Sequence, residues 1–166
     1  MPITNDAEMT AMISKIASKV VWQVSGDMLE VLAGYIWRET YGESSPPNLY
    51  YYNGSGYPTE QFLNAFKLTN VEQKLNEIVT ELYYSWQSMD FDADTFLHGS
   101  PWSGDMREAL ADILNVDGST GFSTKVRQPY WDDFIEEMFD RGGLDNLFDK
   151  YIAQEFGKVG IQAVRG

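Results

Sequence analysis

The first 41 residues carry an apolar pattern that constrains the fold more than any other feature of the chain. Apolar side chains recur there at gaps of three and four residues, as on one face of a helix: Met9, Ile13, Ile16, Val20, Val24, Met28, Val31 and Tyr35. We predict a continuous helix over residues 6–41, about 50 Å long at 1.5 Å per residue. Because a glycine inside a helix costs about 1 kcal/mol relative to alanine, a helix folded in two at Gly26 is the alternative.

A helix of this length exceeds the diameter of the small domain that follows it. Part of its apolar stripe then lacks an intramolecular partner and needs another subunit. We therefore predict that Val20 and Val24 belong to an assembly interface. If the helix instead folds back at Gly26, the same stripe is an ordinary core face.

Residues 50–86 are expected to form a turn followed by an antiparallel hairpin. Asn53, Gly54, Ser55 and Gly56 follow a run of three tyrosines, and the two glycines are expected to need positive φ. In residues 71–86 the apolar side chains fit both helical spacing and strand alternation, so periodicity leaves both open. The β-branched and aromatic content of residues 78–86 favours the strand.

Helices are expected in residues 103–157. Ser103 is placed to cap a helix that ends at Asn115, and Pro129 opens another, with Trp131, Phe134, Ile135, Met138 and Phe139 buried. A last helix ends at Gly157. The chain is thus predicted to be one α+β domain over residues 1–166, with a long N-terminal helix, a central hairpin or small sheet, and two or three C-terminal helices.

Composition limits the classes of protein to which the chain can belong. Its 43% hydrophobic and 14% aromatic content is too high for a disordered chain, even with a net charge of -13. No apolar run approaches the roughly 20 residues that span a bilayer, so no membrane partner is expected. A pI near 4.3 argues against direct nucleic-acid binding. With no cysteine and no leader-like start, we expect an intracellular protein.

The alternating carboxylates Asp90, Asp92 and Asp94 are the most site-like feature of the sequence, because hard cations such as calcium prefer oxygen ligands. A calcium loop counted from Asp90 requires glycine where Thr95 stands and glutamate where Pro101 stands. We therefore expect a solvated acidic loop and no metal.

No catalytic constellation is expected either. His98 is the only histidine, and the chain has neither a cysteine nor a nucleophile-elbow motif to place beside it. The acidic pairs Asp132-Asp133 and Glu136-Glu137 fall opposite the aromatic stripe of their helix and are expected to face solvent. No cofactor is expected.

The ten tyrosines and five tryptophans are a surplus that suits burial against another protein. Tyr50, Tyr51, Tyr52 and Tyr57 cluster beside the predicted turn. For these four we weigh an assembly interface against burial in the core.

The stretch from Tyr50 to Leu68 resembles the central segment of the small tail-completion and neck proteins of tailed bacteriophages. In that family a long N-terminal helix leads through a tyrosine-bearing loop and an apolar anchor into a β-hairpin, which implies a hairpin turning near residues 74–76 here. The family usually has Arg-Thr-Gly before the anchor, whereas this chain has Gly56-Tyr57-Pro58-Thr59. Partial matches follow at His98-Gly99-Ser100, residues 107–115 and residues 127–134.

The resemblance implies a non-enzymatic virion protein in the neck or tail-completion ring between head and tail. It implies a homo-oligomeric ring, with a hexamer or dodecamer expected, that contacts adaptor, portal-side or tail-tube proteins. The protein would lie in the virion, and in the host cytoplasm during assembly, without binding nucleic acid sequence-specifically. The alternative is an acidic inhibitor or DNA mimic that occupies the groove of a basic nucleic-acid-binding protein.

Overall fold

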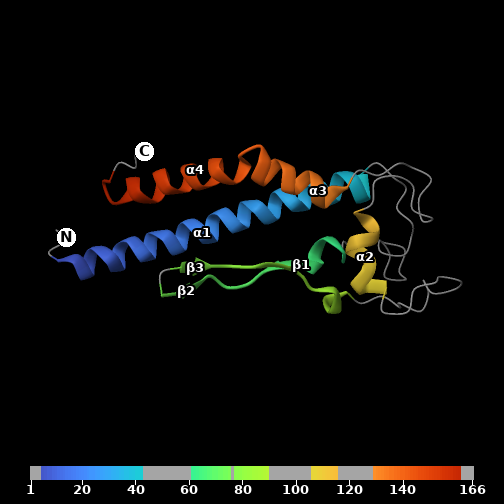
Figure 1. The fold of residues 1–166 in the computed structure, drawn as a ribbon, viewed down its shortest axis with the longest axis horizontal. Helices are drawn as coiled ribbons and strands as arrows, with labels where there is room; N and C mark the ends of the chain where they lie inside the picture. The colour runs from blue at the N-terminus through green and yellow to red at the C-terminus, as the bar shows by residue number, and fades with distance from the viewer. Residues whose placement is uncertain (1–4, 43–60, 76, 90–105, 116–128, 162–166) are drawn as a thin grey trace, which may run out of the picture. The chain divides into compact units, whose positions relative to one another are not determined.

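The computed structural model describes residues 5–42, 61–75, 77–89, 106–115 and 129–161 (Figure 1). They form a mixed α+β fold that is mostly helical, as the sequence predicted. Its elements in chain order are α1 (Asp6–Ile36), a π-helix (Trp37–Gly42), a 3-10 turn (Leu63–Ala65), β1 (Phe66–Leu68), β2 (Glu72–Lys74), β3 (Glu77–Val79), β4 (Leu82–Tyr84), a second 3-10 turn (Trp86–Ser88), α2 (Met106–Leu114), α3 (Tyr130–Ile135), a π-helix (Glu136–Asp140) and α4 (Gly143–Lys158).

Helix α1 is continuous, which confirms the prediction of one long N-terminal helix. Asn5 caps its start, because the Asn5 side-chain oxygen accepts a hydrogen bond of 2.9 Å from the backbone N–H of Glu8. Its 31 residues span about 46 Å. The helix passes through Gly26 and Gly34 without a break, and a Cβ added at either glycine meets nothing within 4 Å. The alternative of a helix folded at Gly26 is therefore wrong.

The hairpin is also confirmed. The strand interpretation of residues 78–86 holds for β3 (Glu77–Val79) and β4 (Leu82–Tyr84), whereas Trp86 begins a 3-10 turn. β2 and β3 are antiparallel, with Glu72 opposite Val79 and Lys74 opposite Glu77. β1 and β4 form the second strand pair. The Thr69 backbone N–H donates to the Glu81 carbonyl at 2.9 Å. The chain reverses after Lys74, where Leu75 adopts a φ of 45°.

Packing divides the chain into two compact units, and the division falls within α1. Unit 1 comprises residues 1–28, 68–82 and 137–166, and unit 2 comprises residues 29–67 and 83–136. In unit 1, α4 runs antiparallel to α1, because Asp27 meets Lys150 while Lys19 meets Glu155 (Figure 1). The buried core residues of this unit are Ile16, Val20, Val24 and Tyr151, with Met12, Met28, Leu144, Leu147, Phe148, Ile152 and Phe156 packed around them.

Unit 2 has an aromatic core centred on Tyr130. The ring of Tyr130 lies edge-on to Phe62 at 5.8 Å and to Phe66 at 6.2 Å between ring centroids. Its hydroxyl donates to the Ala111 carbonyl at 3.1 Å, and the Tyr84 hydroxyl donates to the Arg107 carbonyl at 2.7 Å. Burial, and secondly the charge of Asp112, raise the pKa of Tyr130 well above its usual range. These two hydroxyls attach α2 to the aromatic core.

One expectation about the core was wrong. The helix that follows Pro129 buries Tyr130, Phe134 and Met138, whereas Phe139 is about half exposed. The buried side chains follow each other at a spacing of four residues, and Phe139 lies one position beyond that series. The sequence pattern missed Tyr130, whose side chain is among the most completely buried in the described part of the chain.

The start of α4 depends on Gly143. A Cβ added there would lie 2.7 Å from the backbone oxygen of Glu137, a contact that only a backbone shift relieves. We expect Gly143→Ala to lower the free energy of unfolding by about 2 kcal/mol, as overpacked sites do. The matched control is Gly26→Ala, which has open space and should raise stability by up to about 1 kcal/mol. Urea unfolding measures both, and equal effects would contradict the close approach.

Candidate functional site

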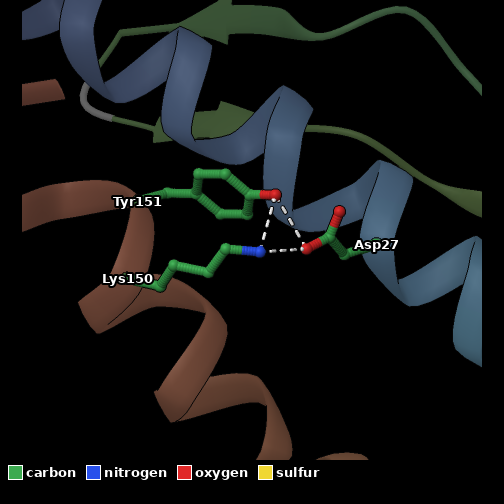
Figure 2. A network of polar contacts seen from close by, with 3 residues as sticks. All are labelled: Asp27, Lys150 and Tyr151. Carbon is green, nitrogen blue, oxygen red and sulfur yellow. Dashed lines mark hydrogen bonds and ion pairs between the residues drawn. The ribbon is translucent and has the colours of Figure 1, made fainter. Parts of the chain in front are cut away.

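Three polar side chains converge where α4 meets α1 in unit 1. Figure 2 shows Asp27 of α1 facing Lys150 and Tyr151 of α4. Lys150 Nζ donates to Asp27 Oδ2 at 2.9 Å and to the Tyr151 hydroxyl at 3.1 Å. The Tyr151 hydroxyl donates to the same Asp27 oxygen at 2.7 Å. Each member of this triangle therefore contacts the other two.

The charges of the triangle stabilise one another. The hydrogen bond from Lys150, and then the one from Tyr151, lower the pKa of Asp27. The hydrogen bond to Asp27, followed by the one to Tyr151, raises the pKa of Lys150. Both pKa values are therefore shifted further from neutral pH. A general acid or base, in contrast, works best with a pKa near the working pH. The chemistry of the triangle therefore suits holding α4 on α1.

Glu155 forms a second polar contact between the same helices. Its side chain is only 4% exposed, and it pairs with Lys158 in its own helix and with Lys19 of α1 at 3.8 Å. The hydrogen bond from Lys158 is the main cause of the lowered pKa of Glu155. A buried carboxylate needs such partners, because an isolated buried charge is strongly unfavourable. The two contacts together fix the register of α4 along α1.

The triangle predicts a specific acid sensitivity. Because the folded-state pKa of Asp27 is lowered, its contribution to stability is present above the ordinary carboxyl pKa of about 3.9 and is lost as pH falls through the lowered value. Asp27→Asn should therefore be less stable than the wild type at neutral pH, and the difference should shrink below about pH 4.

Urea unfolding at neutral and acidic pH measures this difference. The control is Asp140→Asn at an exposed carboxylate, which should show a smaller difference at neutral pH. A difference for Asp27→Asn that stays constant with pH would contradict the role of the ion pair.

The structure gives Val20 and Val24 an intramolecular partner. Both side chains are buried in the unit 1 core, where Tyr151 of α4 joins them. The expectation that they form an assembly interface with another subunit is thereby corrected. The reason is physical: α4 supplies a second apolar face antiparallel to α1, which the helical spacing of α1 alone does not reveal.

A charge at Val24 should now unfold the protein. We expect Val24→Asp to cost about 3 kcal/mol or more, because the carboxylate would be buried without a partner. Trp22→Asp is the matched control on the same helix, since Trp22 is 69% exposed, and it should change stability by about 0.5 kcal/mol or less. Circular dichroism during thermal unfolding measures both variants. A Val24→Asp protein that stays folded would contradict the burial of this side chain in the core.

Three uncovered apolar side chains of unit 1 lie in the first turns of α1 and at the hairpin turn. Met9 and Ile13 are nearly half exposed, and Leu75 at the hairpin turn is 99% exposed. We name these three residues the N-terminal patch. A surface groove of about 390 Å³ adjoins Ile13 and Leu75, and its other lining residues are Thr10, Ser14, Ala17, Gln73, Glu77 and Ile78.

Several predicted site residues lie outside the described part of the chain. These are the interface tyrosines Tyr50, Tyr51, Tyr52 and Tyr57, the turn residues Gly54 and Gly56, the acidic loop residues Asp90, Asp92 and Asp94, and His98. Among the described residues, no group of three or more histidine, cysteine, aspartate or glutamate side chains is arranged to hold a metal. No described helix has both the length and the apolar character that crossing a bilayer requires.

The sequence did not single out the triangle or Leu75. Asp27 and Lys150 are 123 positions apart, and no local pattern connects them. The sequence held only a weak indication that Leu75 is exposed. The hairpin was expected to turn near residues 74–76, and an apolar side chain at a turn is exposed.

Comparison of the chain with models of protein families, with curated proteins and with solved structures finds no match.

Proposed function

We propose that the protein is a non-enzymatic structural component of a tailed bacteriophage, in the neck or tail-completion ring between head and tail. The observation that carries the proposal is the order of elements. A long N-terminal helix is followed by a hairpin, as the resemblance to the neck proteins implies. The proposed partners are further copies of the chain, in a hexamer or dodecamer, and adaptor, portal-side or tail-tube proteins.

The polar contacts of unit 1 support a structural role. Asp27, Lys150 and Glu155 have pKa values shifted in the direction that keeps each group charged, and they link α1 to α4. An assembly protein needs a rigid scaffold of this kind. The proposed location is the virion, and the host cytoplasm during assembly.

The distribution of charge favours this role over the acidic inhibitor. A DNA mimic requires carboxylates that stand in for regularly spaced phosphates and pair with a cationic groove. Some described acids instead lie beside a basic residue of the same chain: Glu137 is 3.9 Å from Arg141, and Glu72 is 3.6 Å from Lys74. In a ring, the net charge of -13 would repel the DNA backbone and let it slide past.

The decisive experiment is detection of the protein in purified phage particles. We expect mass spectrometry to find the chain in virions, in the copy number of a ring and not of a capsid shell. The purified protein should not retard duplex DNA in a gel at physiological salt. A pull-down from infected cells that returns one basic nuclease or polymerase, released by moderate salt, together with virions lacking the chain, would establish the inhibitor instead.

A further inference from the structure

We propose that the free protein pairs with a second copy of itself through the N-terminal patch. In this pair, Leu75 of each copy occupies the groove beside Ile13 of its partner. The pairing concerns the protein outside the virion and does not rest on the proposed phage role.

Leu75 combines two unfavourable features. Its φ of 45° lies in the left-handed region, which glycine and asparagine adopt far more readily than leucine. Its side chain is 99% exposed, so the folded chain gains almost nothing from burying it. Backbone strain of this kind is concentrated at functional positions, where the surroundings or a partner maintain it. A partner that buries Leu75 would offset both features.

The groove next to Leu75 provides the place for such a side chain. Ile13, Ala17 and Ile78 give it apolar walls, and its volume of about 390 Å³ is open to the surface. A protruding leucine and a groove with both apolar and polar lining residues therefore lie side by side on one face of unit 1. This is the arrangement of a two-fold interface, in which the same patch of both copies makes the contact.

The charged residues on either side of the Leu75 turn have opposite signs, so this patch can pair with a second copy of itself. Lys74 and Glu77 face each other across the hairpin on either side of the turn. A two-fold axis near the turn brings Lys74 of each copy toward Glu77 of the other, so both contacts are attractive. A membrane surface would instead require an excess of basic residues, which this alternating pattern does not offer. The charge pattern thus favours a second copy of this chain.

Leu75→Asn tests the apolar part of the pair. Asparagine tolerates a positive φ, so the variant should keep or raise the thermal stability of the protein. Its self-association should weaken at least about 100-fold, because each pair loses two buried leucines. Sedimentation equilibrium of the full chain, up to about 1 mM protein, measures this change.

Trp22→Gln is the matched control for an exposed apolar side chain. Trp22 is nine residues from Ile13 and so lies about 180° around α1 from it. The control should leave self-association unchanged. If it weakens the pair as strongly as Leu75→Asn does, the proposal is overturned and the interface lies on the opposite side of the helix.

A charge exchange tests whether the partner is a second copy. Lys74→Glu and Glu77→Lys alone should each weaken pairing about tenfold at low salt, because like charges then face each other. An equimolar mixture of the two variants should restore it, since opposite charges meet again in the mixed pair. Mixing rescues only an interface in which Lys74 of one copy meets Glu77 of another.

Two further results would overturn the proposal. One is a mass of 18.9 kDa, that of the monomer, at every concentration of the wild-type protein. The other is a mixture that associates no better than either charge variant. Both results leave the virion experiment untouched, and absence from virions would equally leave the pairing intact.

Discussion

The packing of α4 on α1 through Val20, Val24 and Tyr151 is the contact on which unit 1 depends. A helix with an apolar stripe is not stable alone in water, because most helical stability in proteins comes from burying that face. The 16 residues of α4 span about 24 Å, roughly half the length of α1. One helix therefore covers only part of the other. The polar contacts of Asp27 and Glu155 determine which part is covered.

The regular elements were predictable from the sequence because their signals are local. The spacing of apolar residues identified α1, and the β-branched and aromatic content of residues 78–86 correctly favoured a strand over a helix. The partner of the α1 stripe was not predictable in this way, since a stripe covered by α4 and one covered by another subunit have the same spacing. The triangle was also beyond prediction, because its two halves lie 123 positions apart.

The tyrosine surplus shows the limit of arguing from composition. Three of the described tyrosines make contacts inside a single unit: Tyr84 and Tyr130 in unit 2, and Tyr151 in unit 1. In each case the ring packs among apolar side chains, while the hydroxyl donates to a backbone carbonyl or to a carboxylate. A tyrosine that suits an interface because it is both apolar and polar suits a core for the same reason. A count of tyrosines therefore does not distinguish the two locations.

The ends of α4 have a consequence for how the sequence can change over time. Gly142 and Gly160, with φ of 78° and 77°, flank the helix, and the Ile161 N–H closes it by donating to the Phe156 carbonyl at 3.0 Å. An insertion or deletion of one residue inside α4 would rotate every later side chain by about 100°. Inserted before Tyr151, it would turn both Tyr151 and Glu155 away from α1 at once. Over evolution, substitutions within α4 should therefore be tolerated more readily than insertions or deletions that change the length of this helix.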